Sequence, residues 1–256
     1  MKVYKNIAYS DIGHVRQVLD LYLPESDEFD VFVYFHGGGL QNGSKECAEE
    51  WAEYLTQHNI ALVAANYRMY PSAVFPEFVR DAAAAVGWTF RNIGDFGKAK
   101  GIYVGGSSAG GYLSMMLCFD KSYLAPYGIH PTQIAGYVHD AGQPTSHFNV
   151  LREKGLDSRR IIVDETAPLY FIGQDAEYAP MLFLVSDDDM ENRYEQTMLV
   201  LSTLKHFRYD LSKVELKVMH GRHCHYTAYI EGGLAEIVQQ YIAAQNAARP
   251  AKQDLS

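Results

Sequence analysis

Cysteine and basic charge are both scarce in this sequence. The 256 residues include three cysteines, Cys47, Cys118 and Cys224, which is an odd number and too few for a disulfide framework. Lys and Arg number 22 against 31 Asp and Glu, so the formal net charge is −9. Phosphate neutralisation supplies most of the affinity for nucleic acids, and an acidic chain without a basic block is poorly suited to it. We therefore expect reduced thiols and no nucleic-acid partner.

Long apolar runs are also absent. No run approaches the roughly 20 residues that a membrane span requires, and residues 1–10 lack the apolar stretch of a signal peptide. We therefore expect a cytoplasmic protein without a membrane partner. The hydrophobic share is nevertheless 48%, which is enough to bury a sizeable core and excludes disorder for most of the length.

Short apolar runs alternate along the chain with helical patterns. The expected strands span residues 3–9, 17–23, 31–35, 60–65, 102–104, 134–139, 181–185 and 214–219. The expected helices span residues 45–57, 76–90, 109–119, 192–207 and 226–244. This alternation predicts an α/β fold with a mostly parallel central sheet of about eight strands and helices on both faces. The first two strands have no helix between them, which predicts a hairpin at one edge of the sheet.

Two stretches depart from this alternation. The end of the chain, residues 247–256, is small and polar and contains Pro250, so we predict a single domain over residues 1–246 followed by a flexible tail. Residues 140–179 have only weak periodicity, and a loop of that length in a compact domain is usually functional. We predict a lid-like insertion there, with an ordinary surface excursion as the alternative.

The segment Gly106-Ser107-Ser108-Ala109-Gly110 fits the pattern G-x-S-x-G, with Ser108 at its centre between an expected strand and an expected helix. A nucleophile elbow needs this order, because its turn is so tight that side chains at Gly106 and Gly110 would collide with neighbouring backbone. The turn presents the serine hydroxyl near the positive end of the helix dipole. The alternative is a glycine-rich turn with a purely structural role.

A second motif, His36-Gly37-Gly38-Gly39, directly follows the buried run at residues 31–35. Consecutive glycines let the main chain approach a substrate carbonyl, and acyl transfer needs backbone N–H groups aimed at the oxyanion. The three glycines and the N–H of Ala109 are therefore the candidate oxyanion hole. A glycine run alone is more often a flexible turn, but the two motifs in this order, about seventy residues apart, favour the catalytic interpretation.

With these motifs the sequence resembles the α/β-hydrolase fold, and within it the HGGG-type esterase/lipase branch similar to hormone-sensitive-lipase-like carboxylesterases. The segment Asn66-Tyr67-Arg68-Met69-Tyr70-Pro71, followed by Phe75-Pro76 and Asp81, resembles that branch's Y-R-x-x-P…F-P…D pattern. The resemblance covers roughly residues 31–241.

Two features depart from the branch. The sequence before the first motif is too short for the helical cap common there, so we expect residues 140–179 to cover the substrate instead. Ser186 also stands where the branch has a glycine in the acid loop, which blurs the position of the acid.

The resemblance implies a triad in the chain order Ser, acid, His. The acid should follow the strand at 181–185, where the sequence is Ser186-Asp187-Asp188-Asp189-Met190. Aligning Ser186 with the branch's glycine selects Asp189. Asp187 is the alternative, because Asp187-x-x-Met190 also resembles a D-x-x-V loop. A solvated turn or a cation site is a third interpretation of these adjacent carboxylates.

The base should follow the last expected strand, where His220, His223 and His225 occur together. Branch members place it two or three residues after a glycine and just before an aromatic residue, which favours His223. His225 is the alternative, and His220 lies too close to the strand. The spacing of the three also suits metal ligation, but no second cluster of ligands accompanies it, so we expect no bound metal.

The sequence therefore predicts a serine carboxylesterase for small short-acyl esters, acetyl esters included, that needs no cofactor. One alternative is amide hydrolysis of the arylformamidase or peptidase kind, which would use the same triad. Another is a non-catalytic binding protein on a hydrolase scaffold. The motifs specify no oligomeric state. The candidates for an acyl or alcohol pocket, each equally suited to core or lid packing, are Tyr67, Tyr70, Phe75, Phe148, Tyr170, Phe171 and Tyr178.

Overall fold

Runs of β-branched and aromatic residues form the strands at the centre of the molecule. The computed structural model describes residues 1–226 and 233–248. Its strands are β1 (Lys2–Ala8), β2 (Val18–Leu23), β3 (Glu28–Phe35), β4 (Ile60–Ala65), β5 (Lys98–Ser107), β6 (Gly136–Asp140), β7 (Met181–Asp188), β8 (Val214–Arg222) and β9 (His225–Tyr226). Every residue of β4 is buried, as expected of a strand covered on both faces.

The helices follow the amphipathic segments between the strands. They are α1 (Glu49–Gln57), α2 (Glu77–Asn92), α3 (Ala109–Phe119), α4 (Phe148–Glu153), α5 (Arg193–His206) and α6 (Gly233–Ala248). Short 3-10 helices span Lys45–Ala48, Ile93–Asp95, Ala125–Tyr127, Pro131–Gln133, Pro168–Phe171 and Leu211–Lys213. No helix within the two described ranges is long and apolar enough to cross a bilayer.

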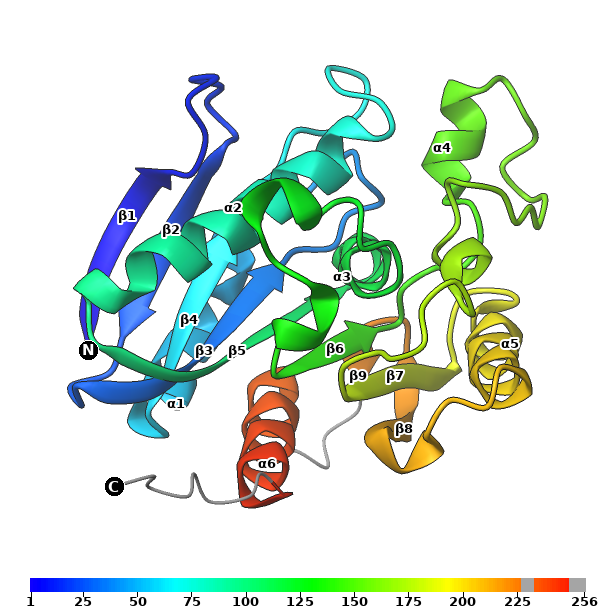
Figure 1. The fold of residues 1–256 in the computed structure, drawn as a ribbon. Coiled ribbons are helices and arrows are strands. Elements are labelled where there is room, and N and C mark those ends of the chain that lie inside the picture. Colours follow the sequence, from blue (N-terminus) through cyan, green and yellow to red (C-terminus); the bar gives the residue numbers. More distant parts are fainter. Residues whose placement is uncertain (227–232, 249–256) are drawn as a thin grey trace.

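The strands form one sheet in the order β1-β2-β4-β3-β5-β6-β7-β8-β9 (Figure 1). Neighbouring strands from β4 to β8 in this order run parallel, whereas β1 and β2 form an antiparallel pair at one edge. The predicted mostly parallel sheet and edge hairpin are confirmed. The ninth strand is a two-residue segment antiparallel to β8, too short for a hydrophobic pattern to reveal.

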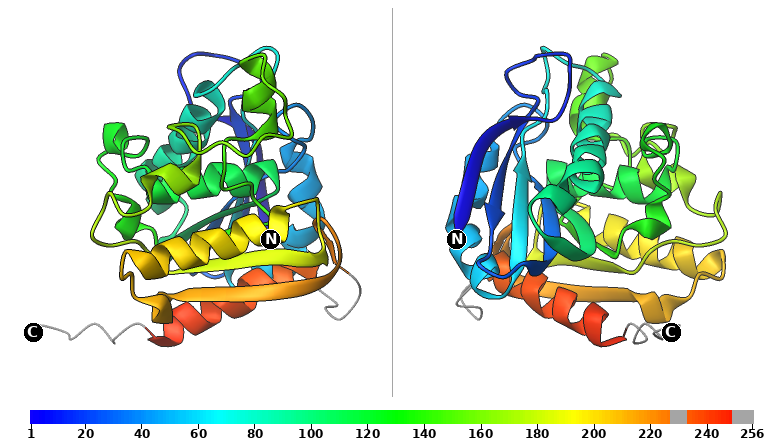
Figure 2. Two further views of the ribbon diagram at one scale, coloured as in Figure 1. Left: turned by 90° about the vertical axis from the view of Figure 1, so that its right-hand side faces the viewer. Right: turned by 60° about the vertical axis from the view of Figure 1, so that its left-hand side comes forward.

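Helices cover both faces of the sheet. One buried cluster joins α2, α3 and α5 to the sheet through residues such as Val79, Leu113 and Val200. A second cluster joins α1 and α6 to the opposite face through residues such as Leu55 and Val238. Figure 2 shows α5 and α6 on opposite sides of β7 and β8. Because β3 to β8 run parallel to one another, their carboxyl ends lie along one common edge of this covered sheet.

The end of the chain differs from the prediction. Tyr226 belongs to β9 rather than to a helix, because it pairs with Gly221 across the turn after β8. The final helix begins at Gly233 and continues through Ala248, two residues past the expected start of the tail. Residues 227–232 of the predicted helix and residues 249–256 of the predicted tail lie outside the described residues.

Residues 140–179 contain α4 and the 3-10 helix at Pro168–Phe171. Apolar side chains such as Val150, Leu169 and Ile172 pack into the core, and side-chain hydrogen bonds add to this anchoring. The hydroxyl of Ser146, itself fully buried, donates to Asp164 at 2.8 Å, and Thr166 donates to the Ser146 oxygen at 2.8 Å. These side-chain hydrogen bonds join Ser146 to residues 164–166 and so hold two parts of the segment to each other.

His139 in β6 provides a test of the core. Burial lowers its pKa to about 3, so the folded protein keeps the ring neutral while the unfolded chain protonates it below about pH 6.5. Between these two pKa values the unfolded state binds one more proton at this residue than the folded state does. The free energy of unfolding therefore decreases by about 1.4 kcal/mol for each unit by which the pH is lowered. His139→Phe should remove that slope between about pH 6 and 4, measured by urea unfolding. Above pH 7 the free energies of unfolding of the wild type and the variant should change with pH in the same way. An unchanged slope at acid pH would contradict a neutral, buried His139.

Candidate active site

Ser108 occupies a strained turn between β5 and α3. Its backbone has φ 54° and ψ −110°, a conformation that few residues other than glycine adopt. A Cβ on Gly110 would lie 1.9 Å from the carbonyl oxygen of Phe35, and one on Gly106 would lie 2.5 Å from the carbonyl carbon of Gly110. The predicted collision with backbone at both glycines is therefore confirmed. The turn leaves the Ser108 side chain in an open pocket.

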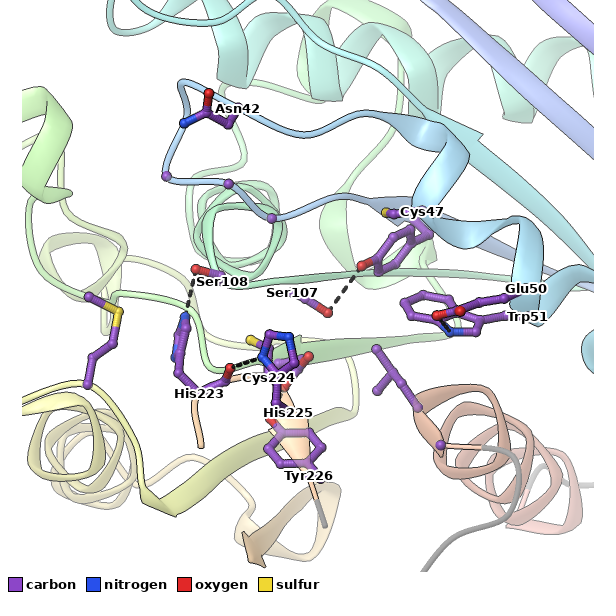
Figure 3. A pocket seen from close by; sticks show the side chains of 18 of the residues that line it. Asn42, Cys47, Glu50, Trp51, Ser107, Ser108, His223, Cys224, His225 and Tyr226 are labelled. Atoms are coloured by element: carbon purple, nitrogen blue, oxygen red, sulfur yellow. Dashed lines mark hydrogen bonds between the residues drawn. The ribbon is translucent and has the colours of Figure 1, made fainter. Parts of the chain in front are cut away.

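His223 lies directly beside this hydroxyl. Its Nε2 is 2.8 Å from Ser108 Oγ, and its Nδ1 is 2.5 Å from Asp189 Oδ1. Asp189 follows β7 and His223 follows β8, so the three side chains come from the carboxyl ends of strands in one parallel sheet. The Asp189 side chain is 1% exposed and that of His223 is 21% exposed. The ring thus bridges a buried carboxylate and an accessible hydroxyl. Figure 3 shows its contact with Ser108.

Backbone amides keep Asp189 ionised. Ser186 N–H donates to Oδ2 at 3.0 Å and Met190 N–H donates to Oδ1 at 2.7 Å. Burial acts to raise the pKa of Asp189, but the hydrogen bonds with His223 and these amides outweigh it and lower the pKa. The Ser186 hydroxyl also donates to the Gly221 carbonyl, which links the end of β7 to the end of β8.

The alternative acid and base do not reach Ser108. Asp187 bonds to His220 instead, with 2.5 Å between Oδ2 and Nδ1, and the two side chains are 45% and 68% exposed. His225 Nδ1 lies 2.9 Å from the backbone carbonyl of His223. The three histidines thus make separate contacts, and no group of three metal-ligating side chains occurs among the described residues.

The glycine loop lies against the elbow. A Cβ on Gly37 would be 3.1 Å from Ser107 O and 3.4 Å from Ser108 Cβ, so this main chain passes close to the serine. Gly38 and Gly39 have φ values of 109° and 65°, which glycine adopts without strain. Ala109 is the first residue of α3, where backbone N–H groups lack partners within the helix. The three glycines therefore line the same pocket as Ser108, and Ala109 follows Ser108 directly in the chain.

His36 holds this loop in place. Its Nδ1 lies 2.7 Å from the Gly37 carbonyl, and its Nε2 lies 3.1 Å from Arg16 Nη2. Burial lowers the pKa of His36 to about 4. A neutral ring that donates from Nδ1 and accepts from Arg16 at Nε2 satisfies both contacts. Tyr67 stacks on the ring at 4.4 Å and donates its hydroxyl to the His36 carbonyl.

The remaining residues of the Y-R…D pattern are structural. Arg68 forms two hydrogen bonds of 2.8 Å with the carboxylate of Asp81, which is 2% exposed. Gln17 donates to the same carboxylate at 2.7 Å. This bidentate pair fixes the segment after β4 on α2 and thereby supports Tyr67 behind the glycine loop.

Ser108 opens into a pocket of about 740 Å³. Figure 3 shows Ser108 and His223 facing one another at one end, with Trp51 and Glu50 at the other. Of the seven aromatic residues proposed for the pocket, only Phe148 lines it. Tyr67 packs on His36, and the other five do not line this pocket either, which favours the alternative of core or lid packing. Tyr34, Trp51 and Tyr226 line the pocket instead, and they come from β3, α1 and β9.

Parts of this chain are similar in sequence to known proteins. Residues 19–126 match the family model BD-FAE. A probable isoprenylcysteine alpha-carbonyl methylesterase of Arabidopsis thaliana is 31% identical over 124 residues, which are 47% of this chain and 29% of that protein. The carboxylic ester hydrolase LipN of Mycobacterium tuberculosis is 33% identical over 111 residues, or 42% and 30% of the two chains. The chain thus matches less than a third of the length of either relative.

Similarity to solved structures extends over nearly the whole chain. A truncated carbohydrate esterase from gut microbiota has a TM-score of 0.77 at 17% identity. The match covers 96% of this chain and 97% of that one. A thermophilic esterase of Thermogutta terrifontis has a TM-score of 0.73 at 21% identity, with 97% of this chain and 94% of that one covered. The chain has the α/β-hydrolase fold.

Two parts of the candidate site in this α/β-hydrolase fold carry no sequence motif. The first is Asp140, which ends β6 and is 2% exposed. Tyr226 donates its hydroxyl to Asp140, and Tyr34 donates to Ser107 Oγ at 3.2 Å. Burial raises the pKa of Asp140, which its hydrogen bonds with Ser107 and Tyr226 oppose. An aspartate at the carboxyl end of a buried strand next to the nucleophile strand is the signal that could have identified it.

The second is Asn149 in α4, which is completely buried. Its side-chain amide donates to the Gly39 carbonyl, and its oxygen accepts from Gln41 Nε2 at 3.0 Å. Asn149 therefore connects residues 140–179 to the glycine loop. A single asparagine has no distinguishing sequence pattern, so only its contacts reveal this position.

Replacing Asn149 should loosen the loop. Asn149→Ala leaves the Gly39 carbonyl and the Gln41 amide without these partners, so we expect a loss of about 1–3 kcal/mol in the free energy of unfolding. Urea denaturation measures this loss. As a control, Gln57→Ala removes an exposed amide that contacts Glu53 at 3.3 Å, and it should cost less than about 0.5 kcal/mol. Equal effects of the two substitutions would contradict the positioning role.

Proposed function

We propose that this α/β-hydrolase is a serine carboxylesterase. The observation that carries the proposal is the continuous chain from Ser108 Oγ to His223 Nε2 at 2.8 Å and from His223 Nδ1 to Asp189 at 2.5 Å. In this arrangement Ser108 is the nucleophile, His223 the general base and Asp189 the residue that orients the imidazole. The curated relatives named as ester hydrolases support the same reaction type.

Acylation begins when Ser108 Oγ attacks the ester carbonyl carbon and its proton passes to His223 Nε2. The carbonyl electron pair moves onto oxygen and forms a tetrahedral oxyanion. Collapse of this intermediate breaks the bond to the alcohol oxygen, which takes the proton back from Nε2. The product of this half-reaction is the free alcohol and an acyl-Ser108 ester.

Stabilisation of the oxyanion falls to the glycine loop and to Ala109. Backbone N–H groups of Gly38, Gly39 and Ala109 are the proposed donors, with Gly37 providing the close approach to the elbow. One such donor contributes about 3–4 kcal/mol to the transition state. The position of Ala109 at the start of α3 adds the favourable end of a helix dipole.

Deacylation repeats the same steps with water. A water molecule gives its proton to Nε2 and attacks the acyl carbon, and Ser108 leaves with that proton as the acid product forms. Asp189 stays ionised throughout, because the amides of Ser186 and Met190 hold its charge. Every group used in this route is a residue of the chain.

The triad assignment predicts unequal effects within each pair of candidates. His223→Ala and Asp189→Asn should each lower kcat for p-nitrophenyl acetate by about 10⁴-fold, because Ser108 loses its base or the base loses its orientation. His225→Ala and Asp187→Asn, the matched controls, should change kcat less than about tenfold. Ser108→Ala should also abolish labelling by a fluorophosphonate, while Ser107→Ala retains it. If His225→Ala abolished kcat while His223→Ala left it unchanged, the assignment of His223 as the base would be refuted.

We further propose that the substrates are small esters with short acyl chains, acetyl included. The pocket of about 740 Å³ must hold the acyl and the alcohol parts together, and Trp51 and Leu234 line it with Phe148. In a p-nitrophenyl series, kcat/KM should fall by about tenfold or more between four-carbon and twelve-carbon acyl chains. An arylformamide and an aminoacyl anilide measured in parallel separate ester from amide hydrolysis. Preference for either amide would replace the esterase proposal.

A further inference from the structure

A second pocket of about 510 Å³ adjoins the one at Ser108. Phe148 and Met190 line both pockets and separate them. Four arginines line the second pocket, namely Arg152, Arg159, Arg160 and Arg193. Such a concentration of positive charge is unexpected in a chain with a net charge of −9, and it lies next to the candidate active site.

Arg193 is the unusual member of this group. It is the first residue of α5 and only 5% exposed, yet its Nε and Nη1 have no hydrogen-bond partner among the described residues. Burial lowers its pKa to about 10, so the guanidinium remains charged at neutral pH. A buried cation without a hydrogen-bonded counter-charge is destabilising, which points to an anion that completes the site.

The surroundings leave the pocket positive. Arg152, Arg160 and Arg193 form no ion pair within residues 1–226 and 233–248, whereas Arg159 pairs with Asp157 at the surface. Among the described residues, Glu191 is the one carboxylate that lines the pocket. The carboxylate of Asp189 acts on Arg193 through its charge, but its oxygens are occupied by His223 and two backbone amides.

Neutral groups complete the lining. His147 is buried nearby, and burial together with the charges of Arg193 and Arg152 holds its pKa well below the usual range, so it adds no positive charge. Gln143 and Gln196 contribute side-chain amides. The N-terminal end of α5, which spans Arg193–His206, adds the positive end of a helix dipole. These groups suit a compact oxyanion that accepts several hydrogen bonds at once.

We propose that this pocket binds the oxyanion of a carboxylate or a phosphate group, with Arg193 as the buried anchor and Arg152 and Arg160 at the rim. This group can come from one of two sources. It is either part of an ester bound at Ser108, which rests on the proposed function, or a free anion. In the first case the enzyme prefers esters that carry a negative charge on the side of Phe148 and Met190.

Binding of inorganic phosphate tests the shared chemistry without any turnover. We expect the wild-type protein to bind phosphate at neutral pH in isothermal titration calorimetry. Arg193→Gln should weaken binding by about tenfold or more, the factor that one charge-assisted hydrogen bond contributes. Arg193→Lys and Arg152→Gln, which disturb the core less, should weaken it too. Arg208→Gln removes the same charge beyond the opposite end of α5 and should leave binding unchanged. No binding to wild-type protein, or equal weakening in Arg208→Gln, would overturn the site.

Matched esters separate the two sources. One pair carries a carboxylate or its neutral amide on the acyl chain, and a second pair carries them on the alcohol. If the anion is part of the substrate, one charged ester should have a higher kcat/KM than its neutral partner. This preference should fall about tenfold in Arg152→Gln and Arg193→Lys and remain in Arg208→Gln. Equal rates within each pair, with phosphate binding intact, assign the site to a free anion. If no ester or amide is hydrolysed while phosphate still binds, the proposed function fails and the anion site stands.

Discussion

The close approach of main chain at the ends of β3 and β5 is the constraint on which the site depends. The carbonyl of Phe35 occupies the space that a side chain at Gly110 would need, and Gly37 passes the backbone of Ser107. Ser108 can hold its strained φ of 54° only because these neighbours have no Cβ. The same contact places the glycine loop beside the nucleophile, so one packing arrangement sets both the serine and the amides around it.

Histidines in this protein divide by their environment. His36, His139 and His147 are buried and held neutral, where each serves hydrogen bonding or packing. His223 instead lies between an accessible hydroxyl and a buried carboxylate, where a proton gained at Nε2 has a counter-charge at Nδ1. Of these four rings, only His223 has a hydroxyl at one nitrogen and a carboxylate at the other.

Residues 140–179 connect the two pockets to the glycine loop. Asn149 holds the glycine loop, and the adjacent Phe148 forms a wall of both pockets. A charged group bound against Arg193 would therefore contact the same helix that holds the glycine loop. In the proposed function, recognition and positioning of an ester would share α4, a helix of six residues.

Local sequence determined the elements and the two glycine motifs, because strand periodicity and tight turns depend on near neighbours. The runs at 60–65 and 109–119 match β4 and α3 to the residue. Tertiary structure decided what local pattern leaves open. Asp189 rather than Asp187 contacts His223 because the chain turns back after β7 onto the Ser186 amide. Trp51 and Arg193 reach the pockets, and Asn149 reaches the Gly39 carbonyl, only through the folding of distant elements. A pairwise contact of that kind has no signature along the chain.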